Sequence, residues 1–307
     1  MEVIRGYGNL GIRGRDFEVL FSHDRGVLTA YRYGGKEMLD AFPVPNFWRA
    51  PTQNDTANGM PARYGVWKLA SLYRWYPGLA AIPEGRYFPE INETEHYVDV
   101  TYDVIVAASA EGRVCRIRYR VSGEGVVRVK MTMNAEGLPE MPEYGMLLRM
   151  DADYDHVEWY GLGPDETYAD RTQGAKLGLY ERAVRDGVAR YLVPQECGSQ
   201  LGVRWAKVTD ERGRGLLFLG GTAADTIPGM TGAARGGMSF SALPYSPHEM
   251  EAAGHPFDLP EVHHTWIRCS LAQMGIAGDD TWGARTHEEF LLPKGRNMTF
   301  EFAFRGI

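Results

Sequence analysis

The chain has 307 residues, with 33 Lys and Arg against 40 Asp and Glu, which gives a formal net charge of −7. Binding to nucleic acid or to an anionic membrane needs clustered positive charge, so this balance argues against either partner. The 37 Gly and 17 Pro residues favour turns over long helices, and the length suits one large β domain or two smaller domains.

Alternation of apolar and polar residues is the strongest local signal, and it predicts strands along most of the chain. In chain order, we expect strands at 16–21, 27–33, 96–106, 115–121, 127–134, 147–150, 157–160, 201–208, 216–219 and 298–305. Helix signals are few. A Ser246 N-cap, Pro247 and Glu249 predict a short helix that ends at Gly254, and a second helix is expected at 62–72.

Three consecutive strands, at 96–106, 115–121 and 127–134, are expected to form an antiparallel meander with one apolar and one polar face. The polar face sets aspartates of the first strand against arginines of the second. We interpret these residues as cross-strand charge pairs and not as a basic patch for a ligand. The segments 43–57 and 161–170 are expected to be ordered loops that carry function.

The three cysteines, at 115, 197 and 269, show no CxxC spacing and are expected to be reduced and buried. We find no signal peptide and no membrane span, so the expected location is the cytoplasm, for a whole protein or for a piece of one. The Asn-x-Thr triplets at Asn54, Asn92 and Asn297 therefore carry no weight.

Chemical motifs are scarce. No Gly-x-Ser-x-Gly elbow or Gly-x-Gly-x-x-Gly loop occurs. Asp279 and Asp280 are adjacent, so they cannot act as a dyad in a strand, and we interpret them as turn and capping residues. His263 and His264 lack metal-ligand spacing. Aromatic residues in loops could instead pack against the C–H faces of sugars, with core or interface packing as the alternative: Trp48, Tyr64, Tyr168, Tyr245 and Trp282.

Three long runs carry a resemblance to a known family. Residues 46–55 (Asn-Phe-Trp-Arg-Ala-Pro-Thr-Gln-Asn-Asp), 160–171 (Tyr-Gly-Leu-Gly-Pro-Asp-Glu-Thr-Tyr-Ala-Asp-Arg) and 274–282 (Met-Gly-Ile-Ala-Gly-Asp-Asp-Thr-Trp) resemble signatures of the last domain of β-galactosidases of glycoside hydrolase family two. They occur in the family's order and spacing. The chain departs from the family pattern at Gln53 and Cys197.

The resemblance implies an all-β fold, a large antiparallel supersandwich like that of galactose mutarotases, with 1–307 as a single domain. It also implies that this chain is the C-terminal portion or the small subunit of a β-galactosidase that hydrolyses terminal β-D-galactosides with retention. The family's catalytic glutamates and magnesium ligands belong to a TIM barrel for which this chain has no room. We therefore expect no catalytic residue, metal site or cofactor here, and an inactive isolated chain.

For individual residues, the resemblance implies that Trp282 stacks against the sugar at the mouth of the active site, on the aglycone side. Asn54, Asp55 and His264 are further candidates for contact with substrate. Arg49 with Asn54 and Asp55, and Glu166 with Asp170 and Arg171, are expected mainly to lock their loops. The expected partners are the catalytic portion or large subunit, in an oligomeric assembly, and the β-galactoside.

A competing hypothesis is a free-standing carbohydrate-binding protein or a mutarotase-like aldose 1-epimerase of the same fold. A mutarotase needs a general base and a general acid that converge on the anomeric carbon. Glu196 could be imagined as the base, with His263 or His264 as the acid.

Overall fold

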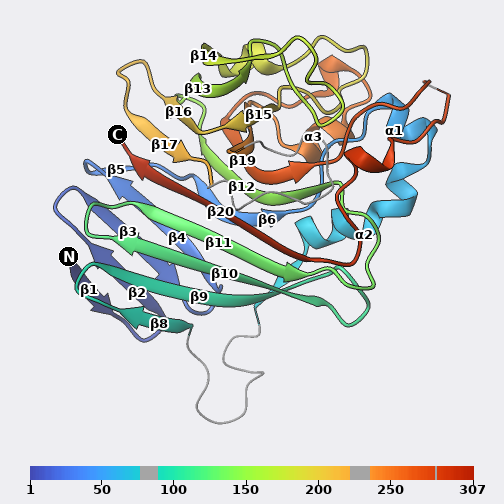
Figure 1. Ribbon diagram of the computed structural model, residues 1–307. Coiled ribbons are helices and arrows are strands. Elements are labelled where there is room, and N and C mark those ends of the chain that lie inside the picture. The colour runs from blue at the N-terminus through green and yellow to red at the C-terminus, as the bar shows by residue number, and fades with distance from the viewer. Residues whose placement is uncertain (77–88, 222–235, 281) are drawn as a thin grey trace.

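The structure is a computed structural model that describes residues 1–76, 89–221, 236–280 and 282–307. Within these ranges the chain is mostly antiparallel β-structure, arranged in three sheets (Figure 1). The largest sheet extends from β14 at the top of Figure 1 to β8 at the bottom. The predicted all-β, antiparallel sandwich is therefore confirmed.

The N-terminal sheet has five strands in sequential order. They are β1 (Glu2–Arg5), β2 (Asn9–Arg13), β3 (Phe17–Ser22), β4 (Val27–Tyr33) and β5 (Lys36–Glu37). This sheet packs on the large sheet through aromatic contacts. The ring of Phe21 lies 5.5 Å from that of Tyr119 and 6.4 Å from that of Tyr102, measured between centroids.

The large sheet has ten strands. In spatial order they are β14 (Lys176–Ala183), β13 (His156–Gly163), β16 (Trp205–Thr209), β17 (Gly215–Leu219), β20 (Asn297–Gly306), β11 (Val127–Asn134), β10 (Arg113–Ser122), β9 (Tyr97–Val106) and β7 (Arg74–Trp75), while β8 (Glu90–Glu93) pairs with β9. The C-terminal strand β20 lies inside this sheet, where it joins β17 to β11.

The third sheet consists of β15 (Gln200–Val203), β18 (Met238–Leu243), β19 (His264–Gln273), β12 (Glu143–Asp151) and β6 (Ala41–Asn46), in that spatial order. Its inner face packs on the large sheet, as the 5.6 Å contact between the rings of Phe240 and Phe218 shows. One hydrophobic cluster, from Leu10 to Phe304, joins all three sheets.

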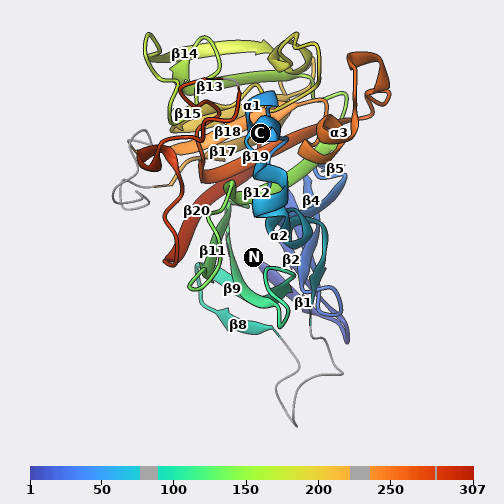
Figure 2. The same cartoon turned by 90° about the vertical axis from the view of Figure 1, so that its right-hand side faces the viewer.

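Three helices gather on one side of the molecule, over the third sheet (Figure 2). They are α1 (Gln53–Ala57), α2 (Met60–Leu72) and α3 (Pro247–Ala252), and short 3-10 turns follow at η2 (Val184–Gly187), η3 (Pro256–Asp258) and η4 (Glu288–Phe290). Ser246 caps α3 as predicted, through a capping box with Glu249. The predicted helix at 62–72 is α2. Among the described residues, no helix is long and apolar enough to cross a membrane.

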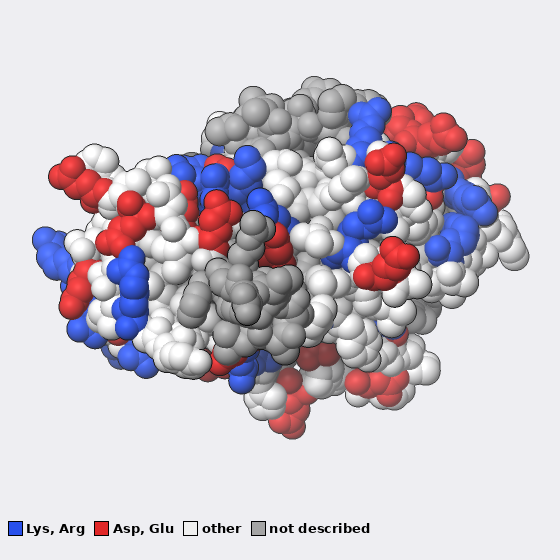
Figure 3. Space-filling view, turned by 90° about the horizontal axis from the view of Figure 1, so that it is seen from below, with Lys and Arg blue, Asp and Glu red and all other residues white. Residues whose placement is uncertain are grey.

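The meander predicted at 96–134 is confirmed as β9, β10 and β11, and its polar face carries the expected charge pairs. Arg116 binds Asp103 and Arg120 binds Asp99, each with a shortest N to O distance of 2.7 Å. Both signs of charge also lie side by side on the face of the molecule seen from below (Figure 3). The three cysteines are free and buried, as expected.

Several local predictions were wrong. The strand expected at 201–208 is two strands, β15 and β16, which belong to different sheets. Gly202 has a φ of +62° in the left-handed region, and the chain crosses between the sheets at Arg204. The segment 43–57, expected to be a loop, contains the end of β6 and all of α1, and the segment 161–170, also expected to be a loop, begins with the last three residues of β13.

Candidate functional site

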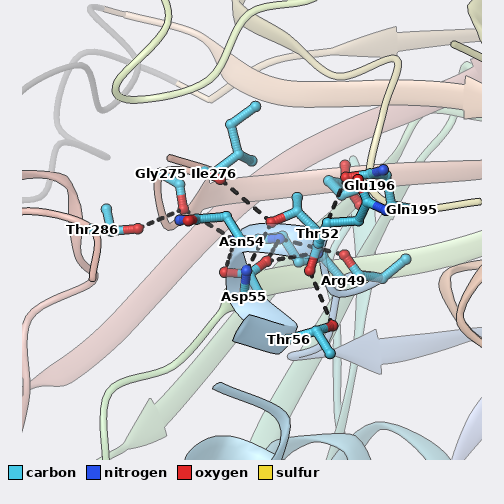
Figure 4. Close-up of polar contacts among 12 residues, drawn as sticks. Arg49, Thr52, Asn54, Asp55, Thr56, Gln195, Glu196, Gly275, Ile276 and Thr286 are labelled. Carbon is cyan, nitrogen blue, oxygen red and sulfur yellow. Dashed lines mark hydrogen bonds and ion pairs between the residues drawn. The ribbon is translucent and has the colours of Figure 1, made fainter. Parts of the chain in front are cut away.

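The three sequence runs that carry the family resemblance meet at one place, around α1. Arg49 Nη2 donates to the carbonyl oxygen of Gly275 at 3.0 Å, which joins the first run to the third. The backbone N–H of Ala277 donates to Asp170 Oδ2 at 2.8 Å, which joins the second run to the third. Figure 4 shows the first and third runs converging, with Arg49 and Asp55 beside Gly275. The described residues of the segment 275–286 (275–280 and 282–286), here called the Trp282 loop, are therefore held by both other runs.

A buried ion pair forms the base of this site. Arg49 and Asp55 have fully buried side chains and are joined by two hydrogen bonds, of 2.6 and 3.2 Å. Asp55 also accepts from the N–H of Thr52, while the Thr52 hydroxyl accepts from the N–H of Asp55, in the capping box that begins α1. Burial alone would lower the pKa of Arg49, but the Asp55 carboxylate outweighs it and raises that pKa, so the guanidinium stays charged.

A second buried charge cluster adjoins the first on the outer face of the third sheet. Arg268 of β19 donates to both oxygens of Glu196 and to Glu143 Oε2, at 2.5 to 3.1 Å. Glu143 also accepts from Ser270 and from the amide of Asn46. Burial raises the pKa of Glu143, against the opposing effect of Arg268. These carboxylates are bound by neighbouring side chains and are closed off from solvent.

The Trp282 loop is ordered by short local contacts. Asp280 Oδ1 accepts from the N–H groups of Trp282 and Ala284, and these bonds lower the pKa of Asp280. Asp279 Oδ1 lies 3.0 Å from His287 Nε2. The interpretation of Asp280 as a turn residue is therefore confirmed. The Trp282 side chain projects from this loop and is 89% exposed.

Asn54 connects α1 to the Trp282 loop. Its amide donates to the carbonyl oxygen of Ala284 at 3.4 Å. With the amide oxygen and nitrogen exchanged, Asn54 donates to the carbonyl oxygen of Asp280 at 2.7 Å and accepts from the N–H of Gly278 at 3.2 Å. We favour this second orientation because it satisfies both polar atoms of a buried amide.

The structure brings together three of the four candidate residues from the sequence: Asn54, Asp55 and Trp282. His264 lies elsewhere, at the start of β19, where its Nδ1 is 2.8 Å from Asp40 Oδ2. Among the other aromatic residues expected in loops, Trp48 and Tyr168 are buried, and Tyr64 is buried within α2 and not in a loop.

The loop locks expected from the resemblance form, with one addition. Arg171 binds Glu166 at 2.7 Å within their own loop, as Arg49 binds Asp55. Asp170 instead reaches a different loop, through the N–H of Ala277. The sequence also gave no indication that Arg268 would be buried in an ion-pair cluster. Its buried position follows from the layer that covers the outer face of the third sheet.

The geometry does not support the roles imagined for a mutarotase. Glu196 is buried and bound to Arg268, whereas His264 lies four residues from Arg268 along β19, a separation of about 13 Å in a strand. Among the described residues, no group of three or more His, Cys, Asp or Glu side chains could hold a metal ion. The site presents the exposed indole ring of Trp282 on a loop that Arg49 and Asp170 hold by hydrogen bonds.

Comparisons with known proteins place these observations in a family. A family model described as "Beta galactosidase small chain" matches residues 13–304. A "Beta-galactosidase" of Halalkalibacterium halodurans is 36% identical over 98% of this chain and 28% of its own length. A "Beta-galactosidase small subunit" of Latilactobacillus sakei is 31% identical over 98% of this chain and 96% of its own length.

The chain thus spans about a quarter of the length of the longer relatives, since it covers 26% of the "Beta-galactosidase" of Priestia megaterium, which is 34% identical. Among solved structures, a galactose mutarotase-like protein from Lactobacillus casei aligns with a TM-score of 0.45 and 11% identity, over 98% of this chain and 100% of that one. Galactose 1-epimerase from Lactobacillus acidophilus aligns with a TM-score of 0.43 and 8% identity, over 97% and 94%.

Proposed function

Since the chain belongs to the β-galactosidase small-chain family, we propose that it completes a β-galactosidase whose catalytic groups lie in another portion of the enzyme. The observation that carries this proposal is the Trp282 loop. It is held by α1 and by Asp170, yet its largest side chain is left in solvent. An exposed indole on a fixed loop is suited to a surface that becomes part of a pocket on assembly.

In the assembled enzyme, the ring of Trp282 would form one side of the mouth of the active site. Sugars present flat C–H faces that pack on aromatic rings, while their hydroxyl groups need polar partners. The ring would contact the aglycone side of a terminal β-D-galactoside. Asn54 and Asp55 would then act as positioning residues, because they hold the loop and not the sugar.

The bond-breaking chemistry is assigned to the catalytic portion. Hydrolysis with retention uses two carboxyl groups about 5 Å apart, one as nucleophile and one as acid and base. Around the Trp282 loop, Asp55 and Glu196 are engaged in ion pairs, Asp280 accepts from the N–H groups of its own turn, and Asp170 accepts from the N–H of Ala277. The magnesium expected from the family would likewise belong to the catalytic portion. The free, buried cysteines are consistent with a cytoplasmic assembly.

The test compares the purified chain alone with the chain coexpressed with a large β-galactosidase subunit, using a chromogenic β-galactoside. We expect hydrolysis only from the complex, which should copurify as an oligomer in light scattering. Turnover by the isolated chain would overturn the proposal. Polarimetry on fresh α-galactose provides a second measurement, since accelerated mutarotation by the chain alone would favour the epimerase hypothesis.

Within an active complex, Trp282→Ala should raise KM for lactose about 2- to 10-fold, the worth of one aromatic contact. A small activated aryl galactoside should be affected less. Phe257→Ala is the matched control, because Phe257 is also an exposed aromatic residue, at 81%, but lies in η3. Equal lactose KM values for the Trp282 variant, the Phe257 variant and the parent enzyme would exclude the ring from the site.

A further inference from the structure

The outer face of the third sheet contains a pocket to which the three family runs contribute only Asn46. Its volume is about 270 Å³, close to the lower end of the range for small-molecule sites, about 300–1,000 Å³. The floor includes Phe42 and Val44 of β6 and Trp266 of β19. Arg74 of β7 and His248 of α3 stand at its walls. Figure 2 shows that α2 and α3 lie on the outer side of β12 and β19.

Asn46 lines the pocket and has an unpaired acceptor. Its side chain is 1% exposed, and its amide nitrogen donates to the carbonyl oxygen of Trp48 and to Glu143 Oε2. Both neighbours are acceptors, so the orientation of the amide is fixed. Asn46 Oδ1 then has no hydrogen-bond partner among the described residues. A buried polar atom without a partner calls for an explanation, because leaving it unpaired costs free energy.

Unpaired donors lie around the same pocket. Within the described part of the chain, Trp266 Nε1 and His248 Nδ1 are buried without a hydrogen-bond partner. The half-buried guanidinium of Arg74 has no ion pair there either, and burial lowers its pKa. Burial also lowers the pKa of His248, so its imidazole is neutral at pH 7 and offers one donor and one acceptor.

This combination selects a class of ligand. A hydrocarbon would leave all of these polar atoms unpaired. An anion would satisfy Arg74 and Trp266 but would face the carbonyl oxygen of Asn46. Hydroxyl groups both donate and accept, and a sugar ring adds apolar C–H faces that pack on rings such as those of Phe42 and Trp266.

We propose that this pocket binds a neutral monosaccharide ring, with its hydroxyl groups paired to Asn46, Trp266, Arg74 and His248. The ring would lie over the apolar floor of β6 and β19. This site belongs to the chain itself and needs no catalytic portion, so it goes beyond the function proposed above.

The experiment is a calorimetric titration of the 307-residue chain with D-galactose, up to about 100 mM, because a weak sugar site has a Kd in the millimolar range. We expect saturable binding of one sugar per chain. Trp266→Phe keeps an aromatic ring but removes the N–H, and should weaken binding about 3- to 10-fold. Trp75→Phe is the matched control, because Trp75 is half exposed in β7 and does not line the pocket.

Further variants and further ligands complete the test. Arg74→Gln, at a half-exposed position, should also weaken binding and serves if Trp266→Phe fails to fold. Trp282→Ala should leave binding unchanged, which separates this result from the proposed role of the Trp282 loop. Absence of saturation, or equal affinities for Trp266→Phe and Trp75→Phe, would overturn the proposal. So would tighter binding of galacturonate than of galactose, or equal binding of cyclohexanol.

Discussion

The buried pair of Arg49 and Asp55 allows a sharp test of how the Trp282 loop is held. In Asp55→Asn, the amide NH₂ faces the guanidinium of Arg49, so two donors meet and one buried charge is left without its counter-ion. Both side chains are fully buried. Breaking a buried pair by removing one partner costs about 3–5 kcal/mol. For 307 residues, at an unfolding entropy of about 2.1 cal/mol/K per residue, the change corresponds to a fall in Tm of roughly 5–8 °C.

Asp103→Asn is the control that shows how much of the loss in stability is due to burial of the ion pair. Asp103 binds Arg116 through two hydrogen bonds of 2.7 and 2.8 Å, but the two side chains are 44% and 55% exposed. An exposed pair contributes about 0–1 kcal/mol, because water screens both charges. The free energy of unfolding should therefore fall several times more in Asp55→Asn than in Asp103→Asn.

Denaturant unfolding of both variants measures this difference, and hydrogen exchange locates it. The N–H of Ala277 should lose protection in Asp55→Asn, because Arg49 also holds the neighbouring carbonyl of Gly275. The double variant Arg49→Met with Asp55→Asn should be more stable than Asp55→Asn alone, since it buries no charge. Equal losses in Asp55→Asn and Asp103→Asn would refute the reasoning.

Two further predictions concern the same loop. A Cβ at Gly275 would lie 2.5 Å from Asp170 Oδ2, so Gly275→Ala should destabilise the chain by about 1–3 kcal/mol in denaturant unfolding, whereas Gly65→Ala, in open space within α2, should stabilise it slightly. The hydrogen bond to Asp279 raises the pKa of His287, so the pair supports the loop below the ordinary pKa of 6.5 and is lost as pH rises through the raised value. In an NMR titration, Asp279→Asn should bring the pKa of His287 down towards 6.5, and an unchanged value would contradict the pairing.

The sequence carries an alternating signal both in strands that were predicted and in strands that were missed. In β10, buried Cys115 and Ile117 alternate with the exposed or half-exposed Arg116 and Arg118, so the period of two is visible. All residues of β18 are buried, and most of β19 is, yet both sequences alternate: Met238, Phe240 and Ala242 with serines in β18, and Ile267, Cys269 and Leu271 with Arg268 and Ser270 in β19. Neither strand was predicted.

Other prediction errors concern segments whose sequence does contain a signal for the observed structure. The segment 201–208 changes phase, because Leu201 and Val203 are apolar at odd positions while Ala206 and Val208 are apolar at even ones. A slip of one residue in a strand reverses its faces, which marks the crossing between sheets. The start of α1 is also written in the sequence, as Thr52 followed three residues later by Asp55, an acidic form of the capping box.

For the site, the resemblance supplied Trp282, but the contacts between loops could not be inferred from local patterns. Asp170 and Ala277 are 107 residues apart, and only the tertiary fold brings them to hydrogen-bond distance. An arginine in a strand normally indicates that its side chain is exposed to solvent, but Arg268 is buried. It is buried because Glu143 and Glu196 compensate its charge under the covering loops.

The charged side chains that hold the Trp282 loop are not the side chain that we expect to contact the substrate. Of the side chains that fix the Trp282 loop, Arg49 and Asp55 neutralise each other, and Asp170 Oδ2 accepts from the N–H of Ala277, while Asp170 Oδ1 has no hydrogen-bond partner among the described residues. We expect substitutions at these positions to act on substrate only through the position of Trp282. In an assembled enzyme, Asp170→Asn combined with Trp282→Ala should raise KM for lactose no more than Trp282→Ala alone, because the second change removes the group that the first one displaces. An additive effect would mean that Asp170 reaches the substrate by another route.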